Sequence, residues 1–120
     1  MQNALNDAGK PVKGSRIHVM GVAYKRDIDD MRESPALDVI LLLEKRGARI
    51  TYSDPHVPVL RLDGQQREAS PESAAAEADC VVIVTDHSGF DYQALVERSA
   101  LIVDTRNALK GVFSPKIVRL

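Results

Sequence analysis

The chain has 120 residues, of which 44% are hydrophobic and 28% are charged, and its 16 basic and 17 acidic residues give a net charge of -1. This length and composition are typical of one globular domain with a single core. The balanced charge gives no general attraction to nucleic acid, and the longest apolar runs are far too short to cross a membrane. With one cysteine and no secretory signal in residues 1–14, we expect a cytoplasmic protein without an internal disulfide.

The first half of the chain predicts a strand, a long loop and a helix. Residues 2–8 are typical of the end of a helix, so we expect residues 1–14 to be the remnant of an upstream helix with its connector, and residues 15–120 to form one domain. Residues 16–21 predict a strand, and residues 36–46 predict a helix capped by Ser34. That helix is apolar on most sides, so we expect it to be covered on more than one face.

The second half alternates strands with shorter helices. A helix capped by Ser70 is expected to run to Glu77, and Asp91 is expected to cap a helix over residues 92–99, with Phe90 and Leu95 as a hydrophobic staple. Residues 57–69, which lie between the second expected strand and the helix after Ser70, are expected to be irregular, with a short edge strand near residues 67–69. The remaining strands are expected at residues 50–53, 80–84, 101–104 and 117–118. This alternation predicts a Rossmann-like α/β fold, a three-layer sandwich with a mostly parallel sheet.

Parallel strands end at one edge of a sheet, where open α/β sheets bind ligands. Three cations are expected there without acidic partners in the same strand exits. A single loop lysine or arginine is usually only solvated, but several converging cations favour an anionic ligand, with phosphate the natural candidate. The residues expected at this edge are Tyr24, Lys25, Arg32, Asp54, Thr85, His87 and Arg106.

Other chemistries are less well supported. The first strand exit has Gly21, but Ala23 and Arg26 replace the later glycines of a G-x-G-x-x-G turn, so this domain is not expected to hold a dinucleotide by itself. No His, Cys and carboxylate cluster has the spacing of metal ligands. Cys80 lies inside an apolar strand and is expected to be a core residue, because a reactive thiol needs an accessible, electropositive setting.

A phospho-receiver domain also has about this length and alternation. Asp29, Asp30 and Thr85 superficially match its acidic pair and hydroxyl residue. However, the two aspartates lie well beyond the end of the strand, too far for carboxylates that hold Mg²⁺ at a strand edge, and Arg106 stands where a lysine is required. This interpretation is therefore the weaker one.

Residues 21–35 closely resemble the G-x-A-[FY]-K-x-x-x-x-D-x-R-x-S-P segment that opens the C-terminal, UDP-binding domain of the UDP-glucose/GDP-mannose dehydrogenase family. The Tyr-Lys pair, the Thr-Asp-His loop and the Asp-Thr-Arg-Asn segment look most like the branch that oxidises UDP-N-acetylhexosamines. The match continues, in order, through residues 47–48, 52–55, 78–79, 85–87 and 104–107.

The resemblance implies part of a two-step, four-electron oxidation. In this family the C6 alcohol of a UDP-sugar becomes an aldehyde, then a thioester on a catalytic cysteine and finally a uronate, with two NAD⁺ as oxidants. An N-terminal domain holds NAD, and a central helical region carries the cysteine and forms a homodimer. The implied partners are thus a UDP-sugar and the N-terminal and central domains of the same enzyme, with no nucleic acid and no membrane.

The resemblance also implies roles for individual residues. Tyr24, Lys25 and Arg106 would contact the UDP-sugar, and Arg32 would reach toward the NAD pyrophosphate on the other domain. Cys80 does not stand at the family's nucleophile position, so no catalytic residue is expected in this chain and the chain alone should be inactive. The alternative is a stand-alone nucleotide-binding regulatory module without redox chemistry.

Overall fold

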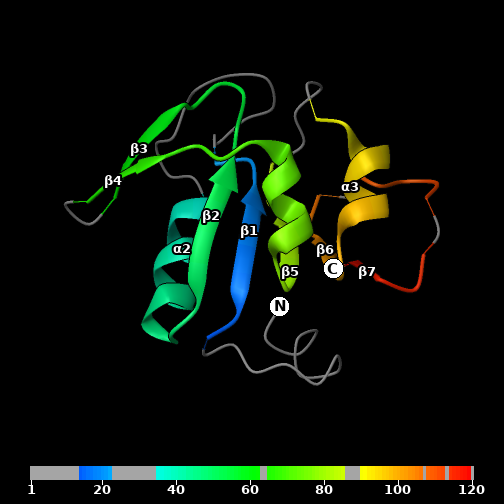
Figure 1. Ribbon diagram of the computed structural model, residues 1–120, viewed down its shortest axis with the longest axis horizontal. Helices are drawn as coiled ribbons and strands as arrows, with labels where there is room; N and C mark the ends of the chain where they lie inside the picture. Colours follow the sequence, from blue (N-terminus) through cyan, green and yellow to red (C-terminus); the bar gives the residue numbers. More distant parts are fainter. Residues whose placement is uncertain are drawn as a thin grey trace.

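The computed structural model describes residues 14–22, 35–62, 65–85, 90–106, 108–112 and 114–119, and its main feature is a five-stranded parallel sheet (Figure 1). The strand order is β2-β1-β5-β6-β7. All neighbouring pairs are parallel, which confirms the predicted fold class. The predicted remnant helix in residues 2–8 lies outside the described residues, as does its connector up to residue 13. The strands are β1 (Arg16–Met20), β2 (Arg49–Ser53), β5 (Cys80–Ile83), β6 (Ile102–Asp104) and β7 (Ile117–Arg119).

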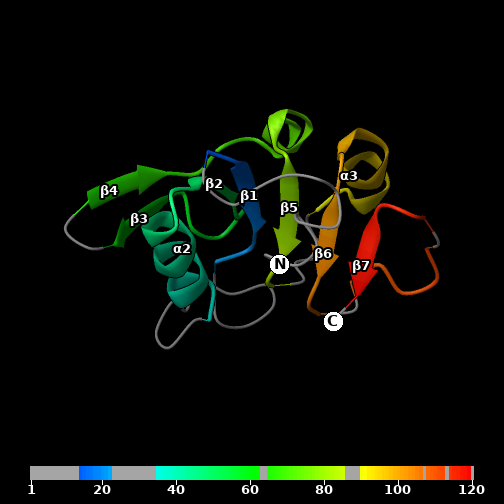
Figure 2. The same cartoon turned by 90° about the horizontal axis from the view of Figure 1, so that it is seen from below.

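Helices cover both faces of the sheet, which gives three layers (Figure 2). Helix α2 (Pro35–Lys45) packs on one face, while the 3₁₀ helix η1 (Glu72–Glu77) and helix α3 (Tyr92–Arg98) pack on the other. Every residue of β5 is buried, as expected for a β-branched central strand covered on both sides. The residues of β1 alternate between the two layers, so one hydrophobic cluster forms on each face.

Helix α2 leaves part of its apolar surface open. Ile40 and Leu43 lie in the core, but Leu42 is 52% exposed. Leu42 is therefore not covered by the described residues, and the expectation that α2 is covered on more than one face stays a prediction for that part of the helix.

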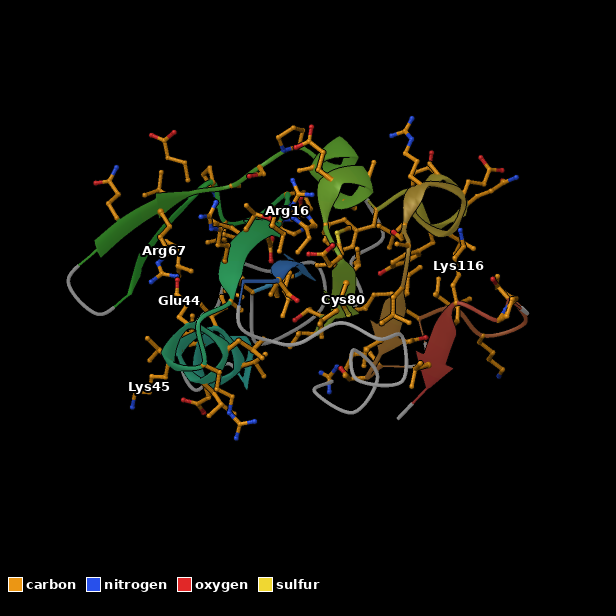
Figure 3. All side chains as sticks on the ribbon, turned by 60° about the horizontal axis from the view of Figure 1, so that its bottom comes forward. Arg16, Glu44, Lys45, Arg67, Cys80 and Lys116 are labelled. Atoms are coloured by element: carbon orange, nitrogen blue, oxygen red, sulfur yellow. The ribbon has the colours of Figure 1, made fainter. Side chains whose placement is uncertain are left out.

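The segment that follows β2 was expected to be irregular with a short edge strand near residues 67–69; a strand does lie there, but the rest of the prediction was wrong. It forms an antiparallel hairpin of β3 (Val59–Leu62) and β4 (Gln65–Glu68). Leu60 is fully buried in the α2-side core. Arg67 of β4 donates two hydrogen bonds, of 2.7 and 2.8 Å, to the carboxylate of Glu44 on α2, and Figure 3 shows the two side chains facing each other. The hairpin is thus tied to the helix by both packing and charge.

Two helix starts differ from one another in their caps. Asp91 caps α3 as predicted, since its Oδ1 accepts a hydrogen bond of 3.1 Å from the N–H of Ala94. The helix after Ser70 is a 3₁₀ helix whose N-cap is Pro71, without a side-chain cap bond, so the predicted Ser70 cap was wrong. Instead, the N–H of Ser70 donates to the carbonyl of Tyr52, and the carbonyl of Ser70 accepts from the hydroxyl of Ser53. Ser70 therefore joins its loop to β2.

A buried polar chain crosses β1 and β2 on the η1 side of the sheet. His18 is fully buried, with Nδ1 2.7 Å from the hydroxyl of Thr51 and Nε2 2.7 Å from the hydroxyl of Ser53. The Ser53 hydroxyl donates its proton to the carbonyl of Ser70, so Nε2–H of His18 donates to Ser53 and Nδ1 accepts from Thr51. Burial lowers the pKa of His18 to about 4, and the imidazole is neutral at pH 7.

Candidate functional site

The sheet has a topological switch point at the carboxyl ends of β1 and β5. The chain passes from β1 outward to β2, and then returns across β1 to β5 on the other side. In open α/β sheets, ligands bind in the crevice outside the strands at this reversal. The edge formed by the carboxyl ends of β1, β2, β5 and β6 is called the strand-exit edge below.

Gly21 brings the exit of β1 directly against the exit of β5. Its φ is +88°, and its N–H donates a hydrogen bond of 2.8 Å to the carbonyl of Ser53. A Cβ at this position would lie 2.6 Å from the carbonyl oxygen of Thr85 and 2.7 Å from its Cβ. Only glycine fits here, because both the backbone conformation and the space exclude a side chain.

Asp54 holds the exits of β1 and β2 together. Its side chain is 5% exposed; Oδ2 accepts a hydrogen bond of 2.8 Å from the N–H of Val22, and Oδ1 accepts one of 2.8 Å from the N–H of His56. The hydroxyl of nearby Tyr52 donates to the carbonyl of Val57 at 3.0 Å. Burial, together with the negative charges of Asp54 and Glu68, raises the pKa of Tyr52 to about 12, so this hydroxyl stays a donor.

Asp104 organises the exit of β6 in the same way. Its carboxylate is 1% exposed, and it accepts hydrogen bonds from the N–H groups of Arg106 (3.0 Å), Ala108 (3.1 Å) and Leu109 (2.9 Å). The hydroxyl of Thr105 donates to the carbonyl of Ile83 at 2.7 Å, which ties this exit to β5. The side chain of Arg106 is exposed at the strand-exit edge.

A hollow of about 170 Å³ lies beside the end of β2. Its walls combine apolar rings with small polar side chains, from the exit of β2, the loop before η1 and the loop before α3. The lining residues are Ser53, Asp54, Pro55, Ala69, Ser70, Pro71 and Phe90.

The structure places Asp54, Thr85 and Arg106 at the edge where the sequence predicted them. Thr85 is 2% exposed, so this residue is packed against Gly21 in the structure. The predictions for Tyr24, Lys25, Arg32 and His87 fall outside the described residues and stay predictions. Sequence reasoning missed the three backbone bonds to Asp104; the signal was an aspartate at a strand end followed by a short polar loop.

The first two amides of the β1 exit bond within the protein: the N–H of Gly21 donates to Ser53 and the N–H of Val22 donates to Asp54. The expectation that this domain does not hold a dinucleotide by itself depends on residues outside the described ranges and stays a prediction. Within the described ranges, no three His, Cys or carboxylate side chains are grouped so as to hold a metal ion. Likewise, none of the helices described is long and apolar enough to cross a membrane.

Cys80 is fully buried in β5, and Figure 3 shows it inside the fold. Its predicted place in the core is confirmed. The side chain belongs to the cluster on the α2 side of the sheet, together with Val82 and Ile40.

A parallel sheet covered on both faces, with Gly21 at its switch point and ligand-accessible strand exits at one edge, defines a Rossmann-like domain. The family model described as UDP-glucose/GDP-mannose dehydrogenase family, UDP binding domain, matches residues 18–111. The chain belongs to this family. The resemblance read from residues 21–35 is thereby confirmed at the level of the family.

Individual relatives differ in their sugars. UDP-glucose 6-dehydrogenase of Rhizobium meliloti (strain 1021) is 40% identical over 108 residues, which are 83% of this chain and 25% of that protein. UDP-N-acetyl-D-mannosamine dehydrogenase of Methanococcus maripaludis (strain C7) is 28% identical over 114 residues, which are 88% of this chain and 25% of that protein. The chain thus spans about a quarter of the length of these relatives.

The same fold is found in solved structures of proteins that are also named as UDP-sugar dehydrogenases. The structure of UDP-D-ManNAc dehydrogenase from Pyrococcus horikoshii superposes with a TM-score of 0.78 at 27% identity, covering 98% of this chain and 28% of that one. The UDP-glucose dehydrogenase from Pyrobaculum islandicum gives a TM-score of 0.67 at 29% identity, covering 86% of this chain and 24% of that one.

Proposed function

We propose that this chain is the UDP-sugar-binding domain of an NAD-dependent nucleotide-sugar 6-dehydrogenase. The observation that carries the proposal is Arg106, an exposed guanidinium held at the strand-exit edge of a domain that belongs to the UDP-binding family. A guanidinium presents planar donors that match phosphate oxygens in pairs. The ligand of this edge is accordingly the diphosphate of UDP with its sugar.

Tyr24, Lys25 and Arg106 are the proposed contacts to the UDP-sugar, and Arg32 is the proposed contact to the NAD pyrophosphate. In the complete enzyme, two NAD⁺ would supply the oxidation of the C6 alcohol to a carboxylate, with water as the source of the second oxygen. The catalytic cysteine is proposed to come from another part of the enzyme, because Cys80, the only cysteine of this chain, is fully buried in the core. NAD is proposed to be held mainly by the N-terminal domain, because Ala23 and Arg26 replace the later glycines of a G-x-G-x-x-G turn in this chain.

The complete enzyme is proposed to include N-terminal and central domains, to form a homodimer and to act in the cytoplasm. The N-acetylhexosamine branch is the finer proposal, based on the Tyr-Lys, Thr-Asp-His and Asp-Thr-Arg-Asn segments. Because the relatives include both a glucose enzyme and an N-acetylmannosamine enzyme, the sugar requires a direct test. UDP-glucose and UDP-N-acetylmannosamine would be compared as substrates of the complete enzyme, and a preference for UDP-glucose would overturn the finer proposal.

The test of nucleotide binding is a titration of the 120-residue chain with UDP, followed by backbone amide NMR. We expect shifts at Gly21, Thr85 and Arg106 and saturation in the millimolar range or below, because an isolated domain offers only part of the contacts. Uridine serves as the control ligand: without the diphosphate it should bind more weakly. Shifts confined to the opposite edge, around Arg49, would contradict the site.

Two alanine variants test the assigned cations. Arg106→Ala and Lys25→Ala should each weaken UDP binding by about 10- to 100-fold, the loss expected for a charge-assisted contact to phosphate. Arg49→Ala is the matched control, because Arg49 is also an exposed arginine but begins β2 at the far edge of the sheet. Unchanged affinity in both site variants would refute the assignment.

The alternative is a stand-alone regulatory module that binds a nucleotide without redox chemistry. The gene distinguishes the two proposals. A dehydrogenase gene encodes a G-x-G-x-x-G segment and a catalytic cysteine in the same reading frame as this chain, whereas the gene of a stand-alone module does not. Enzyme activity also distinguishes them, because a regulatory module would bind UDP but produce no NADH from any UDP-sugar.

A further inference from the structure

Asp104 is a buried carboxylate that accepts hydrogen bonds from three backbone groups of one short loop. Oδ1 accepts from the N–H groups of Arg106 and Ala108, and Oδ2 accepts from the N–H of Leu109. These bonds, of 2.9 to 3.1 Å, have ordinary lengths for a backbone donor. With 1% exposure, the carboxylate is turned away from solvent and toward the loop backbone.

The loop held in this way starts with the residue that is proposed to contact the ligand. Thr105, immediately before Arg106, is fixed to β5 through its hydroxyl bond to Ile83. Leu109, at the other end, is 1% exposed and packs in the core cluster on the α3 side. The backbone of Arg106 is therefore anchored on both sides, while its side chain remains exposed at the strand-exit edge.

We propose that Asp104 is a positioning residue of the nucleotide site, which acts through Arg106 by holding the backbone that aims the guanidinium at the diphosphate. This proposal rests on the proposed function. Asp104 itself does not touch the ligand, because both of its oxygens face the loop.

The physical reason is pre-organisation. An arginine on a mobile loop loses conformational freedom when it binds, and that loss subtracts from the affinity. A loop that is already fixed by three hydrogen bonds in the free protein avoids most of this cost, so the guanidinium starts near its binding position. An aspartate suits this place because its two oxygens accept several N–H groups at once, whereas an asparagine offers one oxygen and an amide donor that would face the loop donors.

The test is a double-mutant cycle on UDP affinity in the 120-residue chain, using Asp104→Asn, Arg106→Ala and both together. Asp104→Asn should weaken UDP binding by about 3- to 10-fold, since at least one backbone N–H loses its acceptor. If Asp104 acts through Arg106, the double variant binds UDP no more weakly than Arg106→Ala alone. Additive effects would overturn the proposal, because they would mean that Asp104 acts independently of Arg106.

Asp91→Asn is the matched control, since it makes the same chemical change in another aspartate that accepts a backbone bond. Asparagine caps helices as well as aspartate does, so this variant should keep wild-type UDP affinity. Affinities are compared at a temperature where urea titrations show each variant fully folded, which removes general destabilisation from the comparison.

The outcomes separate the two proposals. If the wild-type chain does not bind UDP at millimolar concentration, this result contradicts the proposed nucleotide binding and also refutes the positioning role of Asp104. UDP binding that is measurable in wild type and unchanged in Asp104→Asn refutes the positioning role alone and leaves the proposed function intact. A loss of affinity in Asp104→Asn that disappears in the Arg106→Ala background supports both.

Discussion

The N–H of Val22 donates a hydrogen bond of 2.8 Å to the carboxylate of Asp54, a residue 32 positions further along the chain. The bond joins the exits of β1 and β2 at the strand-exit edge, at the second residue of the segment 21–35 that resembles the family's signature. Asp54 was assigned no role from the sequence beyond its place at a strand end. In the structure it accepts hydrogen bonds from the backbone of Val22 and His56 and so joins the two strand exits.

Asp54→Asn should destabilise the fold by about 1–3 kcal/mol, because an asparagine cannot accept from both Val22 and His56 and a buried donor is left unpaired. The free energy of unfolding from urea titrations measures this loss. Asp91→Asn, at an exposed helix cap, should change the free energy of unfolding by only a few tenths of a kcal/mol. Equal losses of unfolding free energy in both variants would contradict the prediction that the buried hydrogen bonds of Asp54 stabilise the fold more than an exposed helix cap does.

Gly21→Ala should destabilise the fold by about 2–5 kcal/mol, since a methyl group there combines a left-handed backbone with a collision against Thr85. Gly14→Ala separates the two causes. Gly14 has a φ of +81°, but a methyl group on its Cα would meet nothing within 4 Å, so it should lose only the backbone cost of about 1–2 kcal/mol. Thermal or urea unfolding gives both values, and similar losses at the two glycines would contradict the close approach at the switch point.

Stability should fall as the pH drops from 6.5 toward 4, because His18 is neutral in the fold and protonates readily once unfolded. The folded pKa of about 4 lies below the unfolded value of 6.5, so the contribution of His18 is complete above pH 6.5 and is lost on acidification. The total loss from this residue is about 3 kcal/mol, at 1.36 kcal/mol per pKa unit. The difference between wild type and His18→Gln, followed against pH, isolates it; parallel curves would contradict the buried neutral imidazole.

Cys80 should not react with an aromatic disulfide reagent in the native chain and should react at once in denaturant, because its side chain is fully buried. Release of the coloured thiolate measures both rates. In the complete enzyme, Cys80→Ala should keep turnover. Fast labelling of the native chain, or loss of turnover without loss of stability, would contradict its place in the core.

Most of the secondary structure could be predicted from the amino-acid sequence because the local signals were strong. The apolar β-branched run of β5 predicts a central strand, and Asp91 before an amphipathic segment predicts a capped helix. The hairpin was missed because β3 and β4 have only four residues each and every residue of β4 is polar. Its clearest signal in the sequence is the Asp63–Gly64 pair, which is typical of two-residue turns. Ser70 was misassigned because its partners, Tyr52 and Ser53, are distant in sequence.

By itself, then, the sequence determined the alternation of strands and helices, the family and the identity of the candidate cations, since each of these depends on residues that are near one another along the chain. Only the tertiary structure decided the strand order, the contact of Gly21 with Thr85, and the pairing of buried Asp54 and Asp104 with the loops at the strand-exit edge. The physical reason is that a buried carboxylate is satisfied by whichever backbone donors the packed strands bring to it. That set of donors exists only after the sheet has formed.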